Sequence, residues 1–85
     1  MDDELRSADS AIAQRDRGTL KRVGHTLKGN CRMVGAVEMG ELAMEIERRA
    51  GSDNEDDCDG IATLLASFRS AKRRFEEALE QEREA

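Results

Sequence analysis

Apolar residues recur every three or four positions along this 85-residue chain, and this spacing is its strongest structural constraint. The pattern runs longest near the C-terminus, where its members are Ile61, Leu64, Leu65, Phe68, Ala71, Phe75, Ala78 and Leu79. Residues spaced in this way share one face of an α-helix, which has about 3.6 residues per turn. The chain also lacks proline, and aromatic residues make up only 2% of it, so little favours a sheet. The sequence therefore predicts an all-α fold.

Four helices are expected, over residues 3–14, 20–34, 37–49 and 58–82. The first three carry shorter apolar stripes, made of Leu5, Ala8 and Ile12, then Leu20, Val23, Leu27, Cys31 and Val34, then Met39, Leu42, Ala43 and Ile46. Thr19 is the expected N-cap of the second helix, and Gly35 its expected end. An acidic loop over residues 51–57 should precede the last helix, with Asp57 as its cap. Short connections make neighbouring helices antiparallel, so we expect an up-down-up-down four-helix bundle that forms a single domain over residues 1–85.

The charge and composition of the chain exclude several classes of protein. Its net charge of −5 argues against a general nucleic-acid binder. It has no apolar run near the roughly 18 residues of a membrane span, and its acidic N-terminus is unlike a signal peptide, so we expect a cytoplasmic protein without membrane contact. Cys31 and Cys58 match no metal-binding spacing, and the acidic loop puts Ala66 where a calcium loop needs glutamate. We therefore expect neither a metal nor a cofactor in this chain.

The only histidine, His25, lies in the second predicted helix. On a helical wheel it falls nearly opposite the core stripe, so its imidazole should be exposed to solvent. Lys21, Lys28 and Arg32 project on the same side of the helix, and residues 17–37 contain five basic residues but no acidic one. A solvated helix face normally mixes both signs of charge. The segment therefore predicts a positive stripe around His25 on an otherwise acidic protein.

Two glycines flank His25, although glycine inside a helix costs about 1 kcal/mol relative to alanine. Gly29 lies one turn from His25 on the exposed face, where the missing side chain lets a bulky group approach the imidazole. Gly24 lies nearer the core stripe, where it would allow a neighbouring helix to pack closely. An exposed nucleophilic imidazole, adjacent cations and a clear approach are what covalent phosphoryl transfer requires.

The segment HTLKG, followed by Gly35 and Ala36, resembles the histidine-containing phosphotransfer (HPt) domain. The family pattern is His-x-Leu-Lys-Gly, five variable residues and Gly-Ala, with a leucine and a Leu-Glu pair further on. These positions are occupied here by His25, Leu27, Lys28, Gly29, Gly35, Ala36, Leu42, Ile46 and Glu47. The motif covers about residues 15–50, and the helix count extends the resemblance to the whole chain. The motif is most similar to that of the domain at the C-terminal end of hybrid sensor kinases.

The resemblance implies that His25 is phosphorylated on Nε2, that Lys28 contacts the phosphoryl group and that Gly29 gives access. The phosphoryl group would come from an aspartate in the receiver domain of a hybrid histidine kinase and pass to the receiver domain of a response regulator. Mg²⁺ would be held by the receiver domain. The residues expected to bind these partners are Lys21, Arg22, Lys28, Gly29 and Arg32.

Further expectations concern the chain as a whole. It contains no glycine-rich nucleotide loop, so it should carry phosphate without kinase activity of its own. Chemistry at one histidine needs only a monomer. Because the first helix is short for the family, two interpretations stay open, a stand-alone cytoplasmic chain and a piece excised from the cytoplasmic part of a longer, membrane-bound sensor kinase.

Two alternatives stay open at this point. The first is a non-catalytic helical module whose basic stripe docks an acidic partner. The second is an HPt domain that belongs to a chemotaxis-type kinase. Phosphorylation of His25 would exclude the first alternative, and the domains that flank the chain would decide the second.

Overall fold

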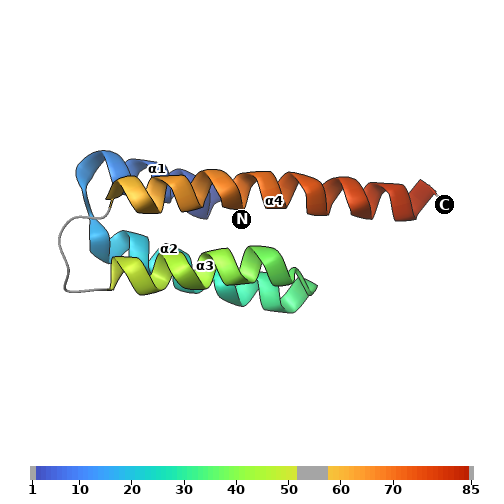
Figure 1. Ribbon diagram of the computed structural model, residues 1–85, viewed down its shortest axis with the longest axis horizontal. Helices are drawn as coiled ribbons and strands as arrows, with labels where there is room; N and C mark the ends of the chain where they lie inside the picture. The colour runs from blue at the N-terminus through green and yellow to red at the C-terminus, as the bar shows by residue number, and fades with distance from the viewer. Residues whose placement is uncertain (1, 52–57, 85) are drawn as a thin grey trace.

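Four antiparallel helices form the protein in the computed structural model, which describes residues 2–51 and 58–84. They are α1 (Asp2–Gln14), α2 (Arg17–Val34), α3 (Val37–Ala50) and α4 (Cys58–Glu84). Figure 1 shows that successive helices run in opposite directions, which is the up-down-up-down arrangement. The predicted all-α four-helix bundle is confirmed, and the helix bounds differ from the predicted ones by at most three residues.

The turn between α1 and α2 differs from the prediction. Arg15 adopts the left-handed conformation (φ 55°), and the Asp16 N–H closes the end of α1 by donating to the Ala11 carbonyl at 2.8 Å. Asp16 is the N-cap of α2, because its Oδ1 accepts from the Thr19 N–H at 3.2 Å and its Oδ2 from the Thr19 hydroxyl at 2.6 Å. The prediction of Thr19 as N-cap is therefore wrong, and α2 begins at Arg17 because the carboxylate of Asp16 satisfies its first turn.

Gly35 ends α2 as predicted. Its φ of 74° is in the left-handed region, which glycine adopts without strain. The Ala36 N–H then donates to the Cys31 carbonyl at 3.0 Å, and α3 begins at Val37. The turn is this short because one left-handed residue reverses the chain, so α2 and α3 are held as an antiparallel pair.

All four helices contribute to one apolar core. Its buried residues are Leu5, Ala8, Ala11, Leu20, Val23, Leu27, Cys31, Ala36, Met39, Ala43, Ile46, Ala50, Cys58, Ile61, Leu65, Phe68 and Ala71. Ile12, Leu42, Leu64 and Phe75 pack against this core and are partly buried. The predicted stripes are thus largely confirmed. The predicted loop at 51–57, including the Asp57 cap, lies outside the described residues except for Gly51.

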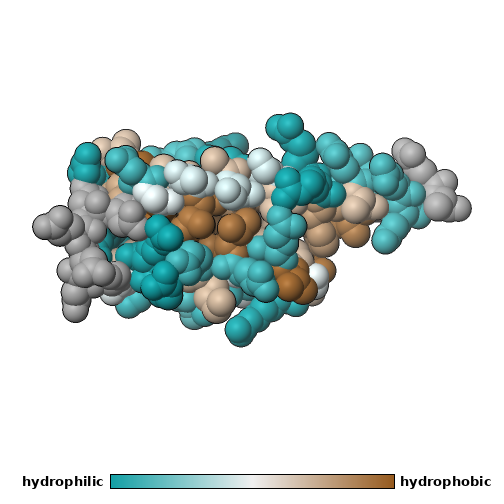
Figure 2. Space-filling model, viewed as in Figure 1, coloured by the Kyte–Doolittle hydropathy of each residue, from teal (hydrophilic) through white to brown (hydrophobic). Residues whose placement is uncertain are grey.

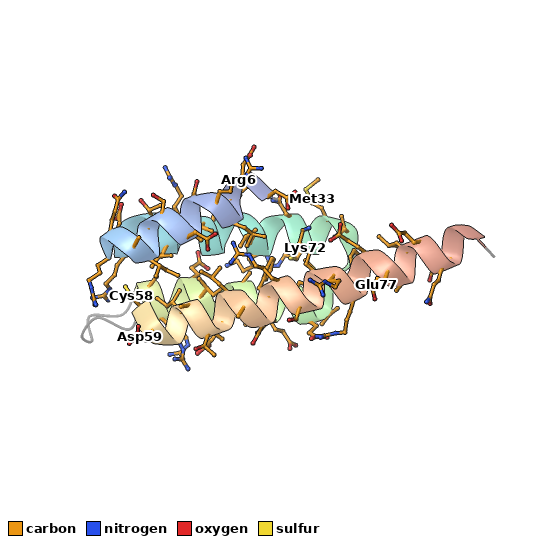
Figure 3. All side chains as sticks on the ribbon, turned by 90° about the horizontal axis from the view of Figure 1, so that it is seen from above. Arg6, Met33, Cys58, Asp59, Lys72 and Glu77 are labelled. Atoms are coloured by element: carbon orange, nitrogen blue, oxygen red, sulfur yellow. The ribbon has the colours of Figure 1, made fainter. Side chains whose placement is uncertain are left out.

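Three predicted core positions are exposed, because the neighbouring helices do not extend far enough to cover them. Val34 is 55% exposed, since α1 is shorter than α2 and ends before the last turn of α2. Leu79 is 41% exposed and Ala78 is also exposed, because α4 runs past the turn between α2 and α3 (Figures 1 and 3). Figure 2 shows brown, apolar side chains gathered near this turn. Neither α4 nor any other described helix contains a stretch long and apolar enough to cross a lipid bilayer.

Candidate functional site

His25 projects from the middle of α2 into solvent. Its side chain is 71% exposed, whereas Val23 and Leu27, two residues to either side, are buried in the core. The helix periodicity accounts for this arrangement, because two residues along a helix turn the side chain by about 200°. The predicted exposure of the imidazole is confirmed.

Glu47 of α3 contacts both His25 and Lys28, the two side chains of α2 that the sequence analysis singled out. Its Oε2 lies 2.7 Å from His25 Nδ1, and its Oε1 accepts from Lys28 Nζ at 2.8 Å. A neutral imidazole that donates its Nδ1–H to this carboxylate keeps a lone pair on Nε2. The geometry therefore orients the ring and leaves the Nε2 lone pair without a share in this hydrogen bond.

The carboxylate of Glu47 is stabilised in its ionised form. The hydrogen bond from Lys28 is the main cause that holds the pKa of Glu47 below its usual value, with the His25 bond a weaker contribution and partial burial opposing both. A carboxylate in this state accepts hydrogen bonds at both oxygens. Glu47 can thus hold His25 and Lys28 at the same time near neutral pH.

Lys28 is partly buried, unlike the solvent-exposed basic residue that the positive stripe predicts. Its side chain is only 22% exposed, because it lies against α3 and pairs with Glu47. Residues 17–37 contain no acidic residue, but Glu47 from α3 brings a carboxylate to His25 and Lys28. Sequence reasoning did not place Glu47 in the site, although its match to the family pattern was a signal that could have identified it.

The other predicted partner-binding residues surround His25 on the outer face of α2. Lys21, Arg22 and Arg32 are all exposed. Arg22, however, lines a hollow with Asp3 and Glu4 of α1, on the opposite side of α2 from Lys28. The basic residues therefore spread over the whole outer face of the helix, with an acidic helix on one side.

The two glycines near His25 have different surroundings. A Cβ built at Gly29 would meet no described atom within 4 Å, so this position is open space one turn from the imidazole. A Cβ built at Gly24 would lie 2.7 Å from the backbone nitrogen of Glu47. The prediction that Gly24 allows close helix packing is confirmed, and the predicted open approach at Gly29 fits the geometry.

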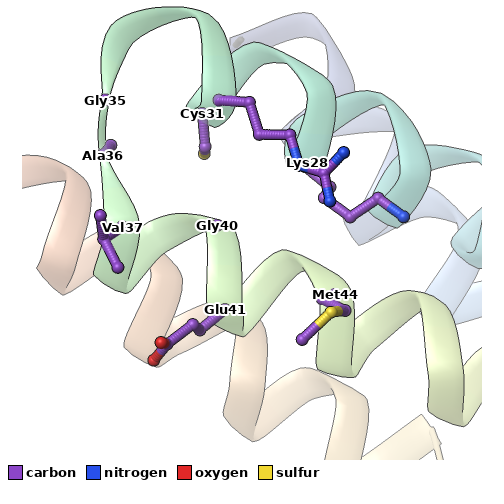
Figure 4. A pocket seen from close by; sticks show the side chains of 9 residues that line it. Lys28, Cys31, Gly35, Ala36, Val37, Gly40, Glu41 and Met44 are labelled. Carbon is purple, nitrogen blue, oxygen red and sulfur yellow. The ribbon is translucent and has the colours of Figure 1, made fainter.

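A groove of about 370 Å³ lies between α2 and α3 beyond Lys28. Figure 4 shows Cys31, Gly40, Val37 and Met44 around it, with Glu41 at one side. Cys31 is 1% exposed and packs in the core as predicted, and burial raises the pKa of its thiol. The groove offers apolar surface next to the site without adding a second nucleophile in its reactive form.

Within residues 2–51 and 58–84, no three histidine, cysteine, aspartate or glutamate side chains converge in a way that could hold a metal ion. The His25 environment, with a lysine beside it, suits an anionic group better than a cation.

Comparison with known proteins gives one positive result. The model of the Hpt domain family matches residues 1–85, which is the entire chain. Searches of curated proteins and of solved structures find no match.

Proposed function

The chain belongs to the Hpt domain family, whose members are phosphocarriers in phosphorelays rather than kinases, and we propose that His25 carries the phosphoryl group. The surroundings of His25 are the main support for this proposal. His25 is the only histidine of the chain, its imidazole is largely exposed, and its Nδ1 bonds to a carboxylate that leaves Nε2 free.

The proposed reaction is an in-line transfer between nitrogen and oxygen. The Nε2 lone pair attacks the phosphorus of an aspartyl phosphate, and the new N–P bond forms as the P–O bond to the aspartate breaks. The aspartate leaves as a carboxylate. The ring then carries a proton on Nδ1 and the phosphoryl group on Nε2, and its positive charge faces Glu47. Transfer to a second aspartate reverses these steps.

Each neighbour of His25 has a proposed part in this reaction. The ammonium group of Lys28 would turn from Glu47 to a phosphoryl oxygen and offset its charge, since a lysine side chain is a flexible point charge. The open position at Gly29 would admit the phosphorylated aspartate and its surroundings. Lys21, Arg22 and Arg32 would attract the acidic pocket of a receiver domain.

The proposed partners are two receiver domains, one that donates and one that accepts the phosphoryl group, with Mg²⁺ bound by the receiver. A hybrid histidine kinase would supply the first domain and a response regulator the second, and both would meet this chain in the cytoplasm. Because one imidazole carries the chemistry, a monomer is sufficient.

The test is transfer of labelled phosphate from a phosphorylated receiver domain. We expect label to arrive on the chain and to be labile in acid but stable in alkali, as a phosphoramidate is. His25→Gln should abolish labelling and leave the melting temperature near that of the wild type, because the side chain is exposed. Label that still reaches the His25→Gln variant would refute the assignment. Binding of the receiver without any transfer would instead support the non-catalytic interaction module.

A further inference from the structure

The backbones of α2 and α3 touch at Gly24. A Cβ at this position would lie 2.7 Å from the nitrogen of Glu47, 3.0 Å from its Cα and 3.1 Å from the carbonyl oxygen of Ala43. All three atoms belong to the backbone of α3, so no side-chain rotation can make room. Any residue larger than glycine must therefore push the two helices apart at this level.

Gly40 shows that this requirement is not shared by every glycine between these helices. It lies on α3, where a Cβ would be 3.5 Å from the Cβ of Cys31 as its nearest described neighbour. That distance is an ordinary van der Waals contact. The interface thus has space for a methyl group at Gly40 and none at Gly24.

The point of contact coincides with the residue that orients the histidine. Gly24 precedes His25 in the chain, and the backbone it touches is that of Glu47, whose two oxygens bond His25 and Lys28 at 2.7 and 2.8 Å. A larger residue at position 24 would therefore displace the backbone that carries the carboxylate bound to the imidazole.

We infer that Gly24 is a positioning residue for phosphotransfer, which acts by bringing the α3 backbone close enough for Glu47 to hold His25 Nδ1. This inference rests on the proposed function of His25. It also explains why the helix accepts a residue with poor helix propensity directly beside its imidazole, since alanine would favour the helix but displace Glu47.

The first test compares Gly24→Ala with Gly40→Ala as the matched control. In Gly24→Ala, the ¹⁵N chemical shifts of the neutral His25 ring should lose the preference for Nδ1–H, and transfer from a phosphorylated receiver should slow by about tenfold or more, because small misplacements are costly in such sites. Gly40→Ala should match the wild type in both measurements. Wild-type ring shifts and transfer in Gly24→Ala would overturn the inference.

A double-mutant cycle tests whether Gly24 acts through Glu47. In a Glu47→Ala background, Gly24→Ala should slow transfer no further, since the contact it disturbs is already gone. If Gly24→Ala slows transfer equally in both backgrounds, it acts by another route and the inference is wrong.

Two further measurements keep the inference testable on its own. Should Gly24→Ala fail to fold, Glu47→Asp shortens the reach of the carboxylate on an unchanged backbone, and it should produce the same change in ring shifts. If Glu47→Asp keeps the preference for Nδ1–H, the contact does not depend on the exact distance between α2 and α3, and the inference is overturned. The ring shifts are measured without phosphate, so they test the effect of Gly24 on the contact between Glu47 and His25 even if the wild-type chain takes up no label. Absence of label on the wild-type chain would refute only the proposed function.

Discussion

Helices α2 and α3 meet through their backbones, whereas α1 and α4 are joined at the surface by long charged side chains. At Gly24 the two backbones leave no room for a methyl group. Between α1 and α4, Arg69 pairs with Asp9 at 2.7 Å, and Lys72, between the two helices in Figure 3, lies 3.4 Å from Asp2. Ion pairs at the surface contribute about 0–1 kcal/mol and tolerate movement.

We expect this difference to separate the part of the molecule that serves stability from the part that serves the proposed transfer. At Gly24 the α2 and α3 backbones are in direct contact, so this pair of helices can position Glu47 at His25. The α1–α4 side needs only to cover the core. Substitutions in α4 should therefore change the free energy of unfolding, and substitutions on the outer face of α2 should change the rate of transfer.

The largest expected effect is on stability and lies in α4. Phe68 is fully buried, whereas Phe75 lies nearer the projecting end and is only partly buried. Phe68→Ala should lower the free energy of unfolding by about 3–5 kcal/mol, and Phe75→Ala by about 1–2 kcal/mol. Urea unfolding followed by circular dichroism measures both. Equal losses would mean that the projecting part of α4 supports the fold as strongly as its packed part.

The next effect is on transfer and lies in α2. Gly29→Gln should slow transfer by about tenfold or more, because a side chain in the open space at this position would crowd the imidazole. Its melting temperature should not fall below that of the wild type. Gly29→Ala is the control for helix propensity and should raise stability by up to about 1 kcal/mol. Wild-type kinetics in Gly29→Gln would show that this glycine does not clear the approach, and unfolding would assign it to packing.

Lys28 and Lys72 form a matched pair that sharpens the comparison further. Their side chains are 22% and 21% exposed, and each pairs with a carboxylate of a neighbouring helix. Lys28→Ala should slow transfer by about two- to fivefold, whereas Lys72→Ala should leave the rate of transfer unchanged. Transfer should also slow as salt rises, since charges are screened over about 8 Å at physiological ionic strength. Equal effects of the two substitutions, without salt dependence, would exclude steering by the basic face.

The smallest expected effect is on acid stability. Because the pKa of Glu47 is lowered in the folded chain, its contribution to stability is complete above the usual value of 4.5 and is lost as pH falls through the lowered pKa. Glu47→Gln should therefore reduce the loss of stability in acid, by about 1 kcal/mol or less, and should slow transfer at neutral pH.

Glu45 provides the control for this measurement, because Arg48 and Arg49 lower its pKa to about 2 on the same helix. Glu45→Gln should also alter acid stability, measured by unfolding at several pH values, but it should leave transfer unchanged because its carboxylate pairs with these arginines and not with His25. Slower transfer in both variants would mean that the total charge of α3 matters and that the contact with His25 does not.

Much of this protein is determined by its sequence alone, because helix periodicity is a local property. The three- and four-residue spacing predicts the four helices, and Gly35 predicts the end of α2 through its freedom to adopt a positive φ. The same spacing places His25 opposite the buried stripe of α2. The motif around His25 then identifies the family to which the chain belongs.

The features that the sequence did not predict depend on distances between helices, and a local sequence pattern gives no information on those distances. Val34 and Leu79 follow the apolar spacing but are exposed, because the neighbouring helices end before they can cover them. Asp16 and not Thr19 is the N-cap of α2, because Arg15 adopts a left-handed conformation that sets where the turn ends.

The site itself was completed only by the tertiary structure. Glu47 lies 22 positions from His25 in the chain and reaches it because α2 and α3 approach each other at Gly24. A helical wheel gives the direction in which a side chain projects, but the closeness of the next helix depends on how both backbones pack. The sequence thus determines that His25 is the proposed nucleophile. The packing of α3 against α2 determines that Glu47 is the carboxylate that orients it.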